Sequence, residues 1–218
     1  MDKKVNFLFN FPFYMATIFS LILVSTAIIF GSLILNINYT AMAQKQPIIN
    51  DPNLQAEILV EGLSFPTSMS FIDNNNILVL EKEEGTVRLI SNGILQEQPV
   101  LKVDVNSNNE RGLLGIAIMN NDTVFLYYTE SSSSSSEDNE PLGNRVYKYQ
   151  WDEEEKILVK PKLILDLPAI PGPNHNGGKL AIGPDNYLYV VIGDLNHEGK
   201  LQNIVTDHNL MILASYSE

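Results

Sequence analysis

His175 and Asp194 are spaced so that they can work together as a general base and the carboxylate that orients it. His175 lies in the loop 171–178, whose prolines and paired glycines predict an irregular segment ahead of a strand. Turn residues at 183–186 predict that the flanking strands pair as a hairpin, which returns Asp194 to the end where His175 begins. A carboxylate on one imidazole nitrogen fixes the tautomer and leaves the other nitrogen to accept a proton. The alternative is a loop histidine with an unrelated aspartate at a strand end.

A second polar segment, residues 109–117 with the sequence NERGLLGIA, places Glu110 and Arg111 directly before a glycine-flanked apolar strand. Polar groups in a loop at the start of a strand can face a central channel, where they would contact a ligand. The alternative is a surface ion pair beside a turn, and the spacing alone favours this simpler interpretation.

Short strand-like runs dominate the chain after residue 44. They are rich in β-branched and aromatic residues, and Gly, Asn, Asp or Pro separate them. No window of helical length in this region carries a 3.6-residue apolar period, so the predicted fold class is all-β. The clearest runs are 77–80, 86–90, 123–129, 145–149 and 187–192.

A weak internal repeat organises these runs into similar units. Three apolar reference positions are separated by 47 residues (71 to 118) and 64 residues (118 to 182), and the longer interval contains the polar insert 131–136. A four-stranded propeller blade takes roughly 40–50 residues, which fits the shorter interval. The reference positions are Phe71, Ile118 and Ile182; the apolar positions six residues later are Ile77, Val124 and Leu188; the acidic positions twelve residues later are Glu83, Glu130 and Asp194.

The number of units bears on how such a fold can close. Residues 44–218 supply three units and a remainder, whereas propellers close with about 4–8 blades and thereby remove exposed strand edges. We therefore expect a partial β-propeller of about three four-stranded blades, in a chain that is an incomplete fragment. Three similar hairpins of a β-sandwich are the alternative.

The N-terminal segment predicts a membrane signal. Residues 5–44 hold no charge, and the 21-residue run 15–35 is long enough, at about 1.5 Å per residue, to cross a hydrocarbon core of roughly 30 Å. Lys3 and Lys4 precede the run, so the following residues are expected outside the cytoplasmic membrane. The small residues at 41–43 are typical of a signal-peptidase site; a cleaved signal and an uncleaved anchor stay open, with a buried core helix as the third alternative.

Composition excludes several classes of function. With 14 basic against 26 acidic residues, the formal net charge is -12, which disfavours binding to nucleic acid. The chain has no cysteine, which rules out a disulfide framework, thiolate catalysis and Cys-ligated metal sites.

Four segments together resemble the soluble quinoprotein glucose dehydrogenases, which are also called the glucose/sorbosone or aldose sugar dehydrogenase family. They are NERGLLGIAI at 109–118, YYTE at 127–130, GNRVYKYQW at 143–151 and HNGGKLAIGPDNYLYVVIGD at 175–194. Residues 61–90 are similar to the first blade of that family. The chain is accordingly divided into a signal peptide or membrane anchor (1–43), a linker (44–56), a partial propeller (57–203) and a tail outside the family pattern (204–218).

The resemblance implies a six-bladed propeller that binds pyrroloquinoline quinone (PQQ) and Ca²⁺ and oxidises aldose sugars at C1, passing electrons to an external acceptor. The catalytic histidine of the family falls on His175 and its partner aspartate on Asp194. The polar residue that contacts PQQ falls on Glu110, where the family often has Gln, and His175 also lies against the cofactor. No residue of this sequence is assigned as a metal ligand.

Two other classes of function remain open on the sequence alone. One is a non-catalytic propeller that acts as an extracellular binding module, and the other is a Ca²⁺-dependent sugar lactonase on a similar fold. Quinone binding separates the first from a dehydrogenase, and turnover of a lactone without an electron acceptor identifies the second.

Overall fold

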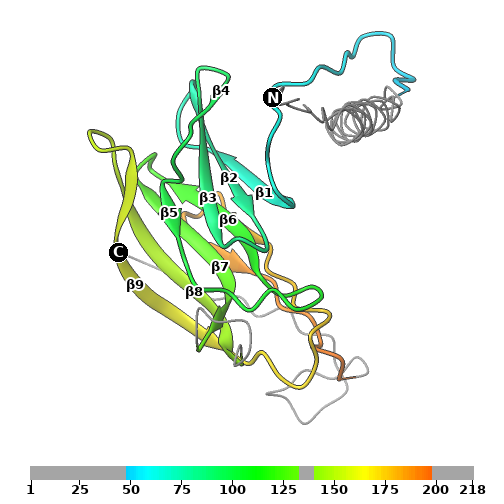
Figure 1. Cartoon of the computed structure of the whole chain (residues 1–218), viewed down its shortest axis with the longest axis vertical. Coiled ribbons are helices and arrows are strands. Elements are labelled where there is room, and N and C mark those ends of the chain that lie inside the picture. The colour runs from blue at the N-terminus through cyan, green and yellow to red at the C-terminus, as the bar shows by residue number, and fades with distance from the viewer. Residues whose placement is uncertain (1–47, 133–139, 198–218) are drawn as a thin grey trace, which may run out of the picture. The chain divides into compact units, whose positions relative to one another are not determined.

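The computed structural model describes residues 48–132 and 140–197 (Figure 1). The chain divides into two units, 1–57 and 58–218, and every regular element in the described ranges is a β-strand of the second unit. The all-β prediction is confirmed. None of the described segments forms a helix long and apolar enough to cross a bilayer. The predicted signal or anchor, the first residues of the linker and the predicted tail lie outside the described residues.

Two antiparallel sheets and a hairpin follow one another along the chain. The first sheet has the order β1-β2-β3-β4, with β5 also pairing to β3; its strands are β1 (Pro66–Phe71), β2 (Asn76–Glu81), β3 (Thr86–Ser91), β4 (Ile94–Leu95) and β5 (Leu101–Lys102). The second sheet has the order β6-β7-β8-β9; its strands are β6 (Leu113–Met119), β7 (Thr123–Ser131), β8 (Pro141–Asp152) and β9 (Ile157–Leu167). The third element is the hairpin of β10 (Leu180–Ile182) and β11 (Leu188–Val190).

The strands lie where the apolar runs predicted them. Four of the five runs fall inside β2, β3, β7 and β8. The fifth is shorter as a regular strand, but its pairing continues beyond β11. The backbone N–H of Val191 donates to the carbonyl of Lys179 at 3.0 Å, and the carbonyl of Val191 accepts from the N–H of Gly178 at 2.8 Å. The hairpin therefore extends towards the loop that carries His175.

The internal repeat is a repeat of hairpin register. Each reference position lies directly opposite the apolar residue six positions later, and the three antiparallel pairs are Phe71–Ile77, Ile118–Val124 and Ile182–Leu188. The three acidic residues are not equivalent in the same way. Glu83 lies in the turn after β2, and Glu130 lies within the longer strand β7. Asp194 instead follows β11, at the open end of its hairpin.

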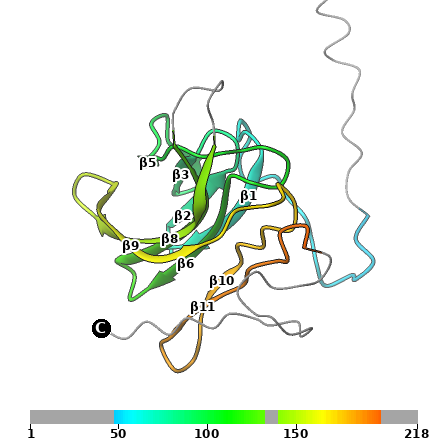
Figure 2. The ribbon, with the colours of Figure 1, turned by 90° about the horizontal axis from the view of Figure 1, so that it is seen from below.

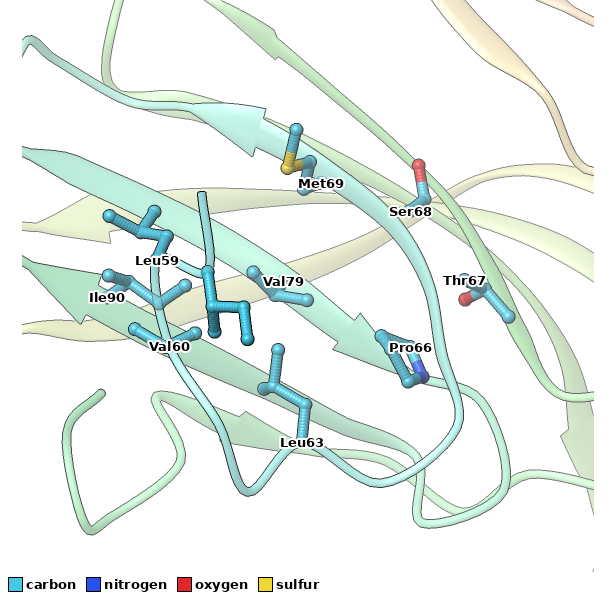
Figure 3. A pocket seen from close by; sticks show the side chains of 10 residues that line it. Leu59, Val60, Leu63, Pro66, Thr67, Ser68, Met69, Val79 and Ile90 are labelled. Carbon is cyan, nitrogen blue, oxygen red and sulfur yellow. The ribbon is translucent and has the colours of Figure 1, made fainter. Parts of the chain in front are cut away.

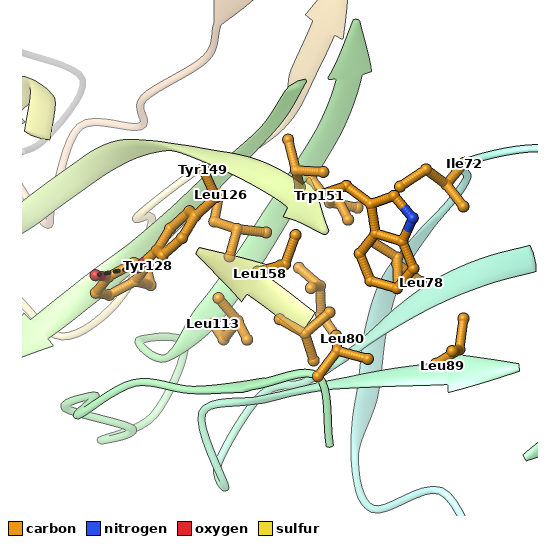
Figure 4. Close-up of a cluster of buried hydrophobic side chains, with 14 residues drawn as sticks. Ile72, Leu78, Leu80, Leu89, Leu113, Leu126, Tyr128, Tyr149, Trp151 and Leu158 are labelled. Atoms are coloured by element: carbon orange, nitrogen blue, oxygen red, sulfur yellow. Dashed lines mark hydrogen bonds between the residues drawn. The ribbon is translucent and has the colours of Figure 1, made fainter. Parts of the chain in front are cut away.

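Two apolar clusters hold the sheets together. One joins the first sheet to the second through residues such as Leu78, Leu80 and Trp151 (Figure 4). The other joins the second sheet to the β10–β11 hairpin, which runs beside β6 (Figure 2), through residues such as Phe125 and Val190. Because successive side chains of a strand point to opposite faces, the second sheet can bury one face in each cluster. This stacking of similar antiparallel sheets is the arrangement expected for a partial propeller.

The outer face of the first sheet carries an apolar groove that includes Met69 and Val79 (Figure 3). These two residues are a register pair, and the equivalent pairs in the next two sheets are Ile116–Leu126 and Leu180–Val190. Both equivalent pairs pack on the preceding sheet. The groove therefore has the residue pattern of a sheet-packing surface, which in a closed propeller receives the last blade.

Candidate active site

The structure brings His175 and Asp194 together. Nδ1 of the imidazole lies 2.6 Å from Oδ1 of the carboxylate, within hydrogen-bond distance. The His175 side chain is 56% exposed and that of Asp194 22% exposed. Because Asp194 occupies Nδ1, Nε2 is the nitrogen left to accept a proton from a ligand.

The loop of His175 lies against the chain that follows β11. His175 has a φ of 60°, in the left-handed region. After Asn176, Gly177 and Gly178 also have positive φ values, of 73° and 98°. Gly193 permits the close contact, since a Cβ there would lie 1.9 Å from the carbonyl oxygen of His175. The same carbonyl accepts a 3.4 Å hydrogen bond from the N–H of Leu195. The open end of the hairpin thus brings His175 and Asp194 together.

Glu110 belongs to the same site although it precedes His175 by 65 residues. Its Oε2 accepts a 2.5 Å hydrogen bond from the backbone N–H of His175, and its side chain is exposed. Three of the sequence candidates, Glu110, His175 and Asp194, therefore meet at one place. Glu110 thus contacts the backbone of the loop, and its contact with the cofactor stays a prediction.

Arg111 does not form the surface ion pair that the spacing favoured. It is buried, and its Nη2 donates to the carbonyls of Ala169 and Gly172, the latter at 2.9 Å. Burial lowers the pKa of the Arg111 guanidinium, and the negative charge of Glu140 partly opposes this. Arg111 therefore points inward and holds the loop that precedes His175.

Sequence reasoning missed three buried polar residues of the second sheet: Asn144 and Tyr127 contact this loop, and Thr129 contacts Asn144. Thr129 donates to Oδ1 of Asn144 at 2.6 Å, and Nδ2 of Asn144 donates to the carbonyl of Pro168 at 3.0 Å. The Tyr127 hydroxyl donates to the carbonyl of Asn176 at 2.8 Å. Burial raises the pKa of Tyr127, so the phenol stays protonated as a donor. The available signal was that these residues lie within the YYTE and GNRV segments, which carry the resemblance.

The side chains gathered around His175 favour one kind of ligand chemistry. The site offers an exposed imidazole with a carboxylate behind it, bordered by glycines, which suits proton removal from a hydroxyl beside a flat ring. It offers no group of three or more His, Cys, Asp or Glu that could hold a metal ion within residues 48–132 and 140–197. These residues fit the reacting edge of a quinone and its substrate.

Comparison with known proteins decides the family. The family model described as glucose/sorbosone dehydrogenase matches residues 63–212. The chain belongs to the glucose/sorbosone dehydrogenase family. The PQQ-bound aldose sugar dehydrogenase of Streptomyces coelicolor superimposes with a TM-score of 0.57 at 26% identity, covering 69% of this chain and 44% of that one. With its antiparallel sheets open at both ends of the stack, this family member has the fold of a partial β-propeller.

Curated relatives include an enzyme and a protein named for an interaction. Quinoprotein glucose dehydrogenase B of Acinetobacter calcoaceticus is 25% identical over 150 residues, which cover 65% of this chain and 31% of that protein. Hedgehog-interacting protein of Mus musculus is 26% identical over 150 residues, which cover 62% of this chain and 21% of that protein. This glucose/sorbosone dehydrogenase family member thus spans a third or less of the length of these relatives.

Proposed function

We propose that the protein containing this chain oxidises aldose sugars at the C1 hydroxyl, with PQQ bound beside His175 and an external electron acceptor. The observation that carries the proposal is the His175–Asp194 pair, 2.6 Å apart with the ring more than half exposed, in a chain of the glucose/sorbosone dehydrogenase family. A sugar dehydrogenase needs a base that reaches the substrate hydroxyl, and this pair supplies one.

His175 acts as the base through Nε2. Asp194 accepts a hydrogen bond from Nδ1–H, which holds the ring in the tautomer whose Nε2 carries a lone pair. The carboxylate also stabilises the imidazolium that forms when the C1 hydroxyl proton arrives. Glu110 fixes the backbone of His175 from the other side. When bound, PQQ supplies the acceptor for the hydride that leaves C1, and Ca²⁺ supplies Lewis-acid polarisation of the quinone.

The test is dye-coupled oxidation of aldoses by the complete propeller, either the natural full-length protein or a chimaera with the remaining blades of the Streptomyces coelicolor relative. We expect turnover that requires both added PQQ and an electron acceptor. Hydrolysis of sugar lactones without an acceptor would instead identify a lactonase. Retained sugar or protein binding with neither activity would identify a binding module, a second candidate that the match to Hedgehog-interacting protein supports.

The protein is also proposed to function outside the cytoplasmic membrane, either secreted or held by its N-terminal segment. The support is the uncharged stretch 5–44 behind Lys3 and Lys4. Protease added to intact cells is expected to digest residues after 44, and mass spectrometry of the mature N-terminus then distinguishes a cleaved signal from an anchor. Recovery of the intact chain from the cytosol would contradict this proposal.

A further inference from the structure

Side chains bind most of the paired carbonyls in the loop between Pro168 and Asn176, in addition to the backbone bonds that Gly172 and His175 make with Leu195. Two of the loop's carbonyls accept from Arg111, at Ala169 and Gly172. The carbonyl of Pro168 accepts from the side chain of Asn144, and that of Asn176 accepts from the Tyr127 hydroxyl. The carbonyl of Pro173 accepts from the side chain of Asn176. Carbonyls of a loop on the protein interior need such partners, because an unpaired buried carbonyl loses its hydrogen bond to water.

The donors from outside the loop come from the second sheet. Arg111 directly precedes β6, Tyr127 lies in β7 and Asn144 lies in β8. All three side chains are buried, and Tyr127 and Asn144 are 0% exposed. These three donors, at one end of the strands of the second sheet, therefore contact the loop together.

The orientations of the Asn144 and Asn176 side-chain amides are determined by backbone carbonyl groups, which can only accept hydrogen bonds. Nδ2 of Asn144 donates to the carbonyl of Pro168, so its Oδ1 must be the atom that accepts from Thr129. Nδ2 of Asn144 also donates to Oδ1 of Asn176 at 3.2 Å, and Nδ2 of Asn176 donates to the carbonyl of Pro173 at 2.6 Å. The chain of bonds therefore includes Asn176, the residue next to His175.

We propose that Tyr127 and Asn144, with Arg111, are positioning residues for His175. They reach only the backbone and Asn176 in this loop, and they fix the backbone on which the imidazole stands so that Nδ1 meets Asp194. The structural part of this inference stands by itself, and its consequence for turnover rests on the proposed function. Because a displacement near 1 Å at a reacting group costs on the order of 100-fold in rate, variants of these residues are expected to lower kcat and leave KM nearly unchanged.

The experiment uses the full 218-residue chain with ¹⁵N-labelled histidine. The chain has 3 histidines, and a His175→Ala variant assigns the signal of His175. Tyr127→Phe removes one hydroxyl without changing the shape of the ring, and Asn144→Asp removes the amide donor. The matched control is Tyr149→Phe, which removes a buried hydroxyl from the same sheet, 3.4 Å from the Tyr128 hydroxyl, in the cluster that faces the first sheet (Figure 4).

We expect the His175 Nδ1 proton to exchange with water roughly 2- to 10-fold faster in Tyr127→Phe, as one lost hydrogen bond predicts. In Asn144→Asp we expect a mixture of imidazole tautomers, and in Tyr149→Phe the wild-type signal. An unchanged His175 signal in Tyr127→Phe, or an equal change in Tyr149→Phe, overturns the inference. If Asn144→Asp does not fold, the test rests on Tyr127→Phe, because this substitution removes only the hydroxyl group and keeps the buried ring.

Activity of the complete propeller separates this inference from the proposed function. Roughly 10- to 100-fold lower kcat in Tyr127→Phe or Asn144→Asp, with near-normal kcat in Tyr149→Phe, supports both. The predicted change in the His175 signal together with an inactive wild-type propeller supports the positioning role and contradicts the sugar dehydrogenase. An active wild-type propeller with unchanged His175 signals contradicts the positioning role alone.

Discussion

His175→Ala in the complete propeller is expected to lower dye-coupled aldose oxidation by roughly 100- to 10,000-fold, the usual contribution of a positioned general base. The variant removes Nε2, the nitrogen that Asp194 leaves available, and it leaves the backbone bond to Glu110 in place. PQQ affinity should therefore stay near the wild-type value. Both quantities are measured on the same preparation, turnover with a dye acceptor and affinity by titration of the cofactor absorbance.

His197→Ala is the matched control, because His197 is exposed and lies three residues after Asp194 in the same region of the chain. We expect it to leave turnover unchanged. Asp194→Asn should lower turnover less than His175→Ala, since an amide oxygen still accepts the hydrogen bond from Nδ1–H, although the carboxylate charge that stabilises the imidazolium is lost. Near-normal turnover by His175→Ala would refute the assignment of the base, whatever the cofactor affinity.

The hairpins were predictable because their signals are local. The six-residue spacing of Phe71 and Ile77 repeats in two later copies. Because the two residues of each pair belong to one hairpin, their spacing can be recognised in the sequence. The pairing of His175 with Asp194 follows from the same logic, because one hairpin separates them. Local patterns of turn and strand residues thus give the part of the site that a single hairpin builds.

The remaining parts of the site depend on how the sheets stack, and local sequence patterns carry no information about this stacking. Glu110 reaches His175 only because the second sheet and the third hairpin share an apolar cluster. Arg111 looked like a partner for its neighbour Glu110, yet its buried guanidinium binds carbonyls 58 and 61 residues further along the chain. Asn144 lies in a segment that resembles the family, but its residue type did not show its role, which is to satisfy a backbone group of a distant loop.

Gly193→Ala is expected to displace His175 and to lower both stability and turnover. The new Cβ would lie 1.9 Å from the carbonyl oxygen of His175 and 3.2 Å from its Cβ. The φ of Gly193 lies outside the left-handed region, so alanine can adopt the backbone conformation and space is the only obstacle. The nearest clash is with backbone, which no rotamer change relieves, and overpacking of this kind typically costs about 1–3 kcal/mol.

The matched control for Gly193→Ala is Gly183→Ala, at the turn of the same hairpin. Its Cβ would meet Oδ1 of Asp185 and the ring of Tyr189, both at 2.4 Å, and these are ends of side chains that can rotate towards solvent. Urea denaturation of both variants should show the larger loss for Gly193→Ala, and only that variant should change the His175 Nδ1 proton signal. Since the loop of His175 and the end of the hairpin meet at this carbonyl, a Gly193→Ala variant with wild-type stability and an unchanged His175 signal would mean that the two segments are not packed in this way.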